Sequence, residues 1–295
     1  MALNKNGIFG IASLILTVLG IALVLLGVLK YTEYAIGFSV AGIGFISINR
    51  PQQLNALNIS TIKELSENLK KVETDKTIKA VILSGEGNKA FVAGADIKEF
   101  ANFSKKEGED LARNGQESLF NLIEKFSKPV IAAVNGLALG GGFEVALAAD
   151  IIVAAKEAVF GLPEPKIGAA AVAGGMHRLA RQIGLKPAMG ILLTADLVTA
   201  QEGHRLGFVN KVVPRNELMA AAVDVAEKII QCAPLAIQAT KQAVMEGLNT
   251  SNLSELQQAQ KDGQFDRLEV MLQSRDIKEG LTAFMEKRKP QWQAK

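Results

Sequence analysis

The chain is poor in the residues from which disulfide bonds and most metal centres are built. It has one cysteine, Cys232, and two histidines, His177 and His204, in 295 residues. A single cysteine excludes an internal disulfide and fits a reducing compartment for the main domain, and we expect Cys232 to be a packing residue. No cysteine and histidine spacing is typical of a zinc site, so no metal is expected.

Signatures of nucleotide and nucleic-acid binding are missing as well. No Gly-Lys-Ser/Thr follows the glycine-rich stretch of the chain, which excludes a P-loop, and no Gly-x-Gly-x-x-Gly precedes a helix there. The net charge is +3 and the pI about 8.8, with a basic cluster at Lys287-Arg288-Lys289. Because no face of interleaved aromatic and basic residues accompanies this mild charge, we expect no nucleic-acid partner.

The N-terminus, in contrast, carries a long apolar run. Gly7 to Leu29 contain no charged residue, and as a helix they would extend roughly 34 Å, enough to cross a hydrocarbon core of about 30 Å. Lys30 and two tyrosines follow, as at many membrane interfaces. We expect residues 1–33 to be a membrane anchor with one transmembrane helix. The alternatives are a signal peptide cleaved near Ser39-Val40-Ala41, a buried helix, or a wrongly assigned start.

The middle of the chain holds the stretch most suggestive of catalysis. An apolar run from Pro129 to Val134 leads into Ala138-Leu139-Gly140-Gly141-Gly142-Phe143-Glu144, and a helix-like run extends from Phe143 to Ala149. This pattern predicts a strand, a glycine turn and a helix start, where bare amides can hold a developing oxyanion. Glu144 and Glu164, in Phe160-Gly161-Leu162-Pro163-Glu164, could divide acid and base roles. The alternative is a tight turn with a glutamate that complements the helix dipole.

Strand and helix patterns alternate through the rest of the chain. A hairpin is predicted from Ile36 to Val40 and Ile43 to Ile48, an amphipathic helix from Ser60 to Glu73, and a buried strand from Ala80 to Leu83. This alternation predicts an α/β protein with crossover connections and a helical tail. The other predicted strands are 130–134, 151–154, 159–160 and 208–213, and the other helices are 111–126, 217–231, 235–248, 257–273 and 277–284.

Several short motifs follow one another in a fixed order. They are Asn49-Arg50-Pro51, Asn55-Ala56-Leu57, Phe91 with Ala93-Gly94-Ala95-Asp96, Asn135-Gly136 before the triple glycine and Glu144, Pro163-Glu164, Gly174-Gly175 with Arg178-Leu179, Glu279-Gly280, Ala283-Phe284 and Glu286-Lys287-Arg288. Each motif is weak alone, but their joint order and spacing make a chance match implausible. From about Ile36 to Trp292, the chain resembles the crotonase (enoyl-CoA hydratase/isomerase) superfamily.

The resemblance implies a crotonase-like spiral of ββα units in residues 34–233 and a C-terminal helical trimerisation region in residues 234–295. It also implies acyl-CoA thioester substrates, no separate cofactor (coenzyme A is part of the substrate), and a homotrimer or hexamer. With both family glutamates present, the expected reaction is the reversible syn addition of water to a trans-2-enoyl-CoA, giving a 3-hydroxyacyl-CoA. Acyl-CoA chemistry and the unpaired cysteine favour a catalytic domain on the cytoplasmic side of the membrane.

The same resemblance assigns roles to individual residues. Glu144 would orient and deprotonate water at Cβ, Glu164 would protonate Cα, and the amides of Ala95 and Gly141 would form the oxyanion hole. Lys98 would contact coenzyme A, and the alternative is a lysine that is merely solvated. Phe284 and Lys287 resemble tail residues that cap the coenzyme A site, often from a neighbouring chain, and the alternative is an ordinary helix end. The substrate-binding positions implied in this way are Ala56, Ala93, Gly94, Asp96, Ile97, Lys98, Gly140, Val172, Phe284 and Lys287.

The sequence also departs from the family pattern. Many hydratases have a Pro-Gly pair where Ala171-Val172 stands, in a loop that helps to position water and shapes the acyl pocket. Gln52 replaces a basic residue that contacts a coenzyme A phosphate. The alternative functions are another acyl-CoA reaction of the superfamily (isomerase or carnitinyl-CoA-dehydratase-like), a non-catalytic membrane-tethered scaffold, and a serine peptidase. The peptidase is disfavoured because no Gly-x-Ser-x-Gly elbow is present.

Overall fold

The structure is a computed structural model that describes residues 30–31, 35–100, 106, 115–248 and 252–295. The predicted transmembrane helix, from Gly7 to Leu29, lies outside the described residues. Among the residues that are described, no helix has both the length and the apolar character needed to cross a membrane.

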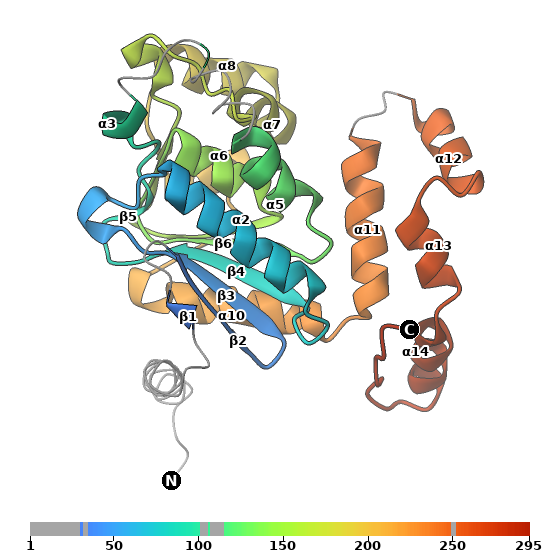
Figure 1. The fold of residues 1–295 in the computed structure, drawn as a ribbon. Helices are drawn as coiled ribbons and strands as arrows, with labels where there is room; N and C mark the ends of the chain where they lie inside the picture. Colours follow the sequence, from blue (N-terminus) through green and yellow to red (C-terminus); the bar gives the residue numbers. More distant parts are fainter. Residues whose placement is uncertain (1–29, 32–34, 101–105, 107–114, 249–251) are drawn as a thin grey trace.

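Two β-sheets form the centre of the fold (Figure 1). The larger sheet has the strand order β1-β2-β3-β4-β6-β8-β11, and the smaller one has the order β10-β9-β7-β5. In the larger sheet β1, β2 and β3 are antiparallel, whereas β3, β4, β6, β8 and β11 are parallel. The strands are β1 (Lys30–Tyr31), β2 (Ala35–Val40), β3 (Ile43–Ile48), β4 (Ala80–Gly85), β5 (Ala90–Val92), β6 (Val130–Val134), β7 (Leu137–Leu139), β8 (Ile151–Ala155), β9 (Val159–Gly161), β10 (Val198–Thr199) and β11 (Lys211–Val213).

Successive strands are shared between the two sheets in a repeating way. β4, β6 and β8 each enter the larger sheet, and the strands that follow them, β5, β7 and β9, enter the smaller one. Helices then return the chain to the larger sheet. This repetition is the ββα spiral that the motifs imply.

Both faces of the larger sheet are covered by helices (Figure 1). Side chains alternate between the faces along each strand, so Ile82 of β4 points to one core and Val81 to the other. Helix α10 (Leu218–Ile230) covers the face that includes Ile82, and the opposite face carries α2 (Ile59–Thr74), α5 (Asn121–Lys125) and α6 (Gly141–Ala148). The remaining helices of the spiral are α3 (Ile97–Phe100), α7 (Gly175–Ile183), α8 (Leu185–Thr194) and α9 (Ala200–Leu206), with short 3-10 or π turns η1 (Pro51–Gln53), η2 (Gln116–Phe120), η3 (Glu164–Ile167) and η4 (Arg215–Glu217).

The sequence predictions and the structure differ at several elements, and the reason is plain at three of them. Strand β7 was not predicted, because it is short and adjoins Asn135-Gly136. The strand expected at 208–213 is only Lys211–Val213, since the amides of Phe208 and Val209 donate to the Gly203 carbonyl at 3.1 and 3.2 Å. The helix expected at 257–273 is divided at Gly263, whose φ of +70° ends one helix before the next begins.

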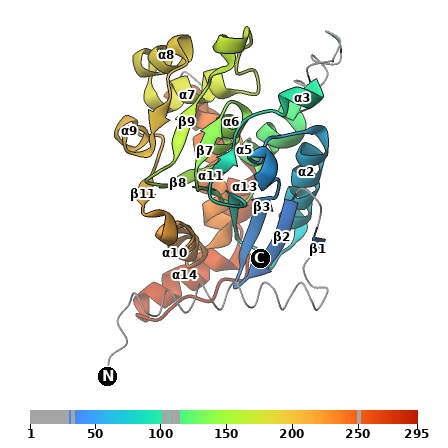
Figure 2. The ribbon, with the colours of Figure 1, turned by 90° about the vertical axis from the view of Figure 1, so that its left-hand side faces the viewer.

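The C-terminal helices stand together on one side of the sheets (Figures 1 and 2). They are α11 (Pro234–Gly247), α12 (Leu253–Lys261), α13 (Asp266–Leu272) and α14 (Arg275–Met285). An ion pair joins this group to the spiral, because Lys241 Nζ lies 2.7 Å from Asp150 Oδ2. The helix expected to start the C-terminal region does begin at Pro234, while the division into domains at residues 33 and 233 stays a prediction.

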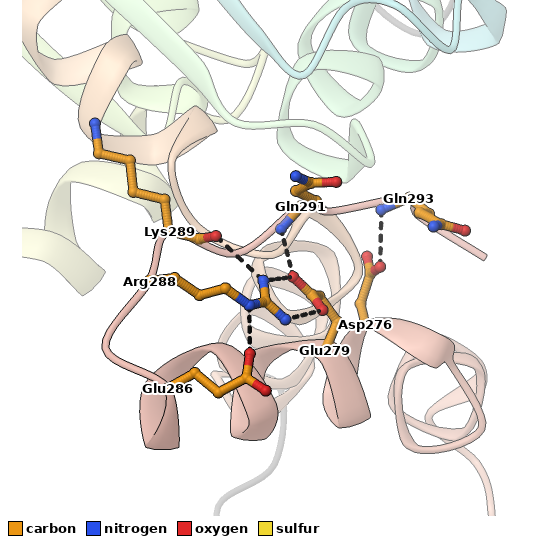
Figure 3. Close-up of polar contacts among 7 residues, drawn as sticks. All are labelled: Asp276, Glu279, Glu286, Arg288, Lys289, Gln291 and Gln293. Atoms are coloured by element: carbon orange, nitrogen blue, oxygen red, sulfur yellow. Dashed lines mark hydrogen bonds and ion pairs between the residues drawn. The ribbon is translucent and has the colours of Figure 1, made fainter.

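The last residues fold back onto α14 through polar contacts (Figure 3). Arg288 forms a two-pronged ion pair with Glu279, with N–O distances of 2.6 and 2.9 Å. The buried Asp276 carboxylate accepts the backbone N–H groups of Gln293 and Ala294 at 2.8 and 2.9 Å. The tail is therefore attached to α14 at two residues near the start of the helix, Asp276 and Glu279.

Candidate active site

The glycine-rich turn joins β7 to α6, and its glycines have different roles. Gly140 has φ +51°, in the backbone region that favours glycine, and a Cβ there would lie 2.8 Å from Glu164 Oε1. Helix α6 starts at Gly141, earlier than the Phe143 predicted. A Cβ on Gly142 would lie 2.0 Å from the Val92 carbonyl, so this glycine is needed for packing against β5. Only Gly140 and Gly141 thus face the predicted chemistry.

Two backbone amides, those of Gly141 and Ala95, lie near each other at this turn. Gly141 is the first residue of α6, and its N–H therefore has no acceptor within the helix. A Cβ on Gly141 would lie 4.0 Å from the Ala95 nitrogen. Ala95 forms an isolated β-bridge with Leu57. The Leu57 N–H donates to the Gly94 carbonyl and the Asp96 N–H donates to the Leu57 carbonyl, so the Ala95 N–H takes no part in the bridge. Two adjacent amides of this kind can hold an oxyanion.

An ion pair fixes the loop that carries Ala95. Arg50 Nη2 lies 2.9 Å from Asp96 Oδ2, and Arg50 Nη1 donates to the Ala56 carbonyl at 2.5 Å. Both charged side chains are mostly buried, with 11% and 18% exposed. Asp96 and the Ala56 carbonyl both contact Arg50, and their predicted contact with substrate stays a prediction. The sequence pointed to Arg50 only as part of a motif, without a role.

Glu144 is a buried carboxyl group, 4% exposed, on α6. Its Oε1 accepts the backbone N–H of Gly175 at 2.8 Å. Burial raises the pKa of Glu144 to about 7, with a further raising effect of Glu164, against the lowering effects of the Gly175 N–H and of Arg178. A carboxyl group whose pKa is close to neutrality is suited to taking up and releasing a proton at physiological pH.

Glu164 begins η3, directly after the strand β9 and Pro163. Its Oε1 faces Gly140, while its Oε2 is buried and has no hydrogen-bond partner within the described part of the chain. Burial raises the pKa of Glu164 as well. The contacts of the two glutamates favour different protonation states. Glu144 accepts a hydrogen bond from a backbone N–H, which favours the carboxylate, whereas the unpartnered oxygen of Glu164 can carry a proton.

Comparison with known proteins places this arrangement in a family. The model of the enoyl-CoA hydratase/isomerase family matches residues 39–295. The chain belongs to the enoyl-CoA hydratase/isomerase family. The short-chain-enoyl-CoA hydratase of Clostridium acetobutylicum is 41% identical over 247 residues, which cover 84% of this chain and 92% of the relative. The crotonyl-CoA hydratase of Syntrophomonas wolfei is 42% identical over 242 residues, covering 82% and 91%.

Solved structures of the enoyl-CoA hydratase/isomerase family share the fold. The enoyl-CoA hydratase of Bacillus anthracis superposes with a TM-score of 0.84 at 34% identity, covering 89% of this chain and all 100% of that one. The crotonase-like α/β fold is therefore confirmed. A second family model, described as a CAL67264-like protein, matches residues 4–57, which include the apolar run from Gly7 to Leu29.

The other positions implied by the family lie at different distances from the glycine turn. Ala93, Gly94, Ile97 and Lys98 follow one another from the end of β5 into α3, and the last two are exposed. Gly94 packs on β7, because a Cβ there would lie 3.3 Å from the Leu139 carbonyl. This segment adjoins the turn and can contact a ligand, but the roles of its side chains stay predictions.

Val172, which stands where many family members have glycine, has an exposed side chain. Its amide donates to the Ala170 carbonyl at 2.9 Å, whereas the adjoining Ala171 side chain is buried. The Val172 N–H is therefore bonded inside its own loop, and the predicted contact of Val172 with substrate stays a prediction.

The family's tail positions lie far from the turn in a single chain. Phe284 is 84% exposed on α14, and Lys287 follows that helix. Both views place α14 at the opposite end of the molecule from α3 (Figures 1 and 2). Their predicted role in capping coenzyme A would require a neighbouring chain.

The residues that the sequence excluded from the site are exposed. His177 and His204 lie on the surface of α7 and α9. Cys232 is also exposed, so its prediction as a packing residue is wrong: it follows the end of α10, where the chain turns towards α11. Among the described residues no group of three or more His, Cys, Asp or Glu side chains is placed to hold a metal ion.

Proposed function

We propose that the chain is an enoyl-CoA hydratase that adds water reversibly to a trans-2-enoyl-CoA. The observation that carries this proposal is the position of two carboxyl groups of raised pKa, the buried Glu144 and the half-buried Glu164, near the amides of Gly141 and Ala95. The names of the related hydratases support it.

In the proposed mechanism the Gly141 and Ala95 amides bind the thioester oxygen. Their hydrogen bonds strengthen as negative charge builds up on that oxygen, which lowers the barrier to attack at Cβ. Glu144 takes one proton from water as the oxygen bonds to Cβ, and Glu164 delivers a proton to Cα from the same face. The product is a 3-hydroxyacyl-CoA, and proton transfer from Glu144 to Glu164 through solvent restores the starting state.

The substrate class that we propose is a short acyl chain. Support comes from the two relatives named for short-chain-enoyl-CoA and crotonyl-CoA. The test is a hydration assay on trans-2-enoyl-CoA thioesters of increasing chain length, following loss of the absorbance of the conjugated double bond and identifying the product by mass. Turnover that moves the double bond without adding the mass of water would replace hydration by isomerisation.

We also propose that the enzyme needs no metal or separate cofactor and assembles as a homotrimer or hexamer. Exposed apolar side chains support the assembly, since Leu193 on α8 is 71% exposed and Leu281 on α14 is 63% exposed. Light scattering of the purified protein tests the assembly, and activity after dialysis against a chelator tests the independence from metal.

For the N-terminus we propose a retained anchor, with the catalytic part on the cytoplasmic side. The uncharged composition of Gly7 to Leu29 supports the span, and the CoA chemistry supports the orientation. Deleting residues 1–33 should give an active protein that no longer sediments with membranes. Release of the full-length protein by a carbonate wash, or digestion of the catalytic part from outside intact cells, would contradict the anchor or its orientation.

A further inference from the structure

Arg178 of α7 is a buried cation that the mechanism above does not use. It is 7% exposed, and its guanidinium grips Glu124 of α5 through Nη2–Oε2 at 2.8 Å and Nε–Oε1 at 3.2 Å. Nη2 also donates to Asn121 Oδ1 at 3.2 Å, and Nη1 donates to the Ala173 carbonyl at 2.8 Å. A buried ion pair is seldom better for stability than apolar packing, so stability alone does not account for the pair of Arg178 and Glu124.

The backbone next to Ala173 leads directly to Glu144. Gly174 has φ +105°, and a Cβ there would lie 2.1 Å from Arg178 Nη1, so only glycine lets the guanidinium approach so closely. The next amide, that of Gly175, is the one that donates to Glu144 Oε1. A Cβ on Gly175 would lie 2.8 Å from Glu144 Cγ. This short piece of backbone is thus held between Arg178 on one side and Glu144 on the other.

We propose that Arg178 is a positioning residue for Glu144: braced by Glu124, it holds the Ala173 carbonyl so that the Gly175 amide meets the Glu144 carboxylate. The inference rests on the proposed function, in which Glu144 is the general base. It assigns the Gly174-Gly175 and Arg178 motif to the support of that base.

The charges around Glu144 give this arrangement a second effect. Glu164 on η3 raises the pKa of Glu144, and Arg178 on α7 lowers it, in addition to the larger effect of burial. Glu124 on α5 is the anion that partly offsets Arg178. The neighbouring strands β5 and β7 contain no titratable side chain, and the other charged or titratable groups on the adjoining α5, η2 and α7 are exposed: Lys125, Glu117, His177 and Arg181. Arg178 is therefore the buried cation that faces this base among the elements packed against it in the described structure.

The experiment compares kcat/KM for crotonyl-CoA against pH in Arg178→Gln, Glu124→Gln and the control Arg181→Gln. Arg181 is a matched control because it lies on the same helix but is exposed. Loss of the Arg178 charge should move the acidic limb of the profile up by about one pH unit, since a cation near a carboxylate lowers its pKa by roughly one to three units. Activity at pH 7 should fall about 5- to 50-fold and recover partly at pH 9.

Glu124→Gln should act in the opposite direction on pH dependence. It removes a negative charge near Glu144 but keeps the side-chain size, so the acidic limb should move down by a few tenths of a pH unit, roughly. Arg181→Gln should leave the profile unchanged. Equal losses at every pH, with no displacement of the limb in either variant, would reduce Arg178 and Glu124 to structural roles and overturn the proposal.

Two further measurements keep the test decisive. If Arg178→Gln does not fold, Arg178→Lys is used in its place, because lysine keeps the positive charge but cannot make the paired hydrogen bonds of the guanidinium. It should retain the position of the acidic limb while lowering kcat. If the wild-type protein hydrates no enoyl-CoA, the proposed function is wrong, but this result does not test the role of Arg178. In that case an NMR titration of Glu144 in wild type and Arg178→Gln still decides whether Arg178 controls the base.

Discussion

The helix that carries Glu144 and the helices at the C-terminus are stabilised in different ways. Every residue of α6 after Gly141 is buried, and its first turn is packed against β5 and the Glu164 segment. In contrast, α12 and α13 bury no residue, and α14 buries only Asp276 and Ala283. Packing within one chain therefore defines the site, whereas polar contacts fasten the C-terminal region and leave apolar side chains such as Leu281 and Phe284 exposed.

Trp292 allows the two regions to be followed separately. It is the one tryptophan of the chain. Its Nε1 donates to the Gln231 carbonyl at 2.8 Å, and its ring packs against Gly280 of α14. Tryptophan fluorescence therefore reports on the C-terminal region, while the hydration assay reports on the site, and a change in one region should leave the other readout unaltered.

The largest effect is expected from removing the acid and base groups. Glu144→Gln and Glu164→Gln should each lower kcat by about 100- to 10,000-fold, because each replaces a proton-transferring carboxyl by an amide of equal size. Coenzyme A binding and Trp292 fluorescence should stay as in the wild type. Steady-state hydration of crotonyl-CoA and longer thioesters measures the effect. If either variant turned over at the wild-type rate, the assigned role of that residue would be wrong.

A smaller loss is expected when one oxyanion donor is deleted. Gly141→Pro removes the amide at the first position of α6, where proline is otherwise well accepted, so the helix should still form. The cost in transition-state stabilisation should be roughly 3 kcal/mol, or about 100-fold in kcat. Gly142→Pro or Gly142→Ala is not a suitable control, since any Cβ there meets Val92. A folded Gly141→Pro variant with normal kcat would exclude this amide from the mechanism.

The difference between the two regions also explains which parts of the structure the sequence could predict. The strand and helix patterns led to an α/β fold with crossovers, and the family resemblance carried by the motif order led to the spiral. That resemblance also assigned the roles of Glu144, Glu164 and the Gly141 and Ala95 amides, which stay predictions. These depend on backbone conformation, which glycine and proline mark clearly. The ion pairs Arg50–Asp96 and Arg178–Glu124 were missed because each joins residues far apart in the chain, with 46 and 54 positions between partners.

Two predicted substrate-binding residues, Phe284 and Lys287, lie far from the glycine turn for a different reason. Phe284 lies on α14, at the opposite end of the molecule from α3, and Lys287 follows that helix; the family resemblance assigned both residues to a neighbouring chain's site, which stays a prediction. The exposure of Cys232 was also beyond sequence pattern, since it depends on the open turn between α10 and α11.

The C-terminal region should respond most strongly to loss of Asp276. Asp276→Ala leaves the backbone N–H groups of Gln293 and Ala294 without their buried acceptor, and hydrogen bonds to a charged group contribute roughly 2 kcal/mol. Release of the tail should expose Trp292 and shift its emission to longer wavelength, with kcat altered less than twofold in the assembled enzyme. Glu255→Ala, an exposed acid on α12, is the control. Unchanged emission would mean that Trp292 docks without Asp276.

The smallest effect concerns the exposed Arg288–Glu279 pair (Figure 3). Arg288 and the Gln291 N–H lower the pKa of Glu279 to about 2. Since the pKa is depressed in the folded protein, any stabilisation of the tail is complete above the unfolded value of about 4.5 and is lost as the pH falls through about 2. The measurement compares Trp292 emission in wild type and Glu279→Gln between pH 6 and pH 2. The two proteins should differ slightly at pH 6, less so in 1 M salt, and converge towards pH 2. Because about half of the Glu279 carboxylate is protonated at pH 2, a difference as large at pH 2 as at pH 6 would mean that the carboxylate charge does not hold the tail.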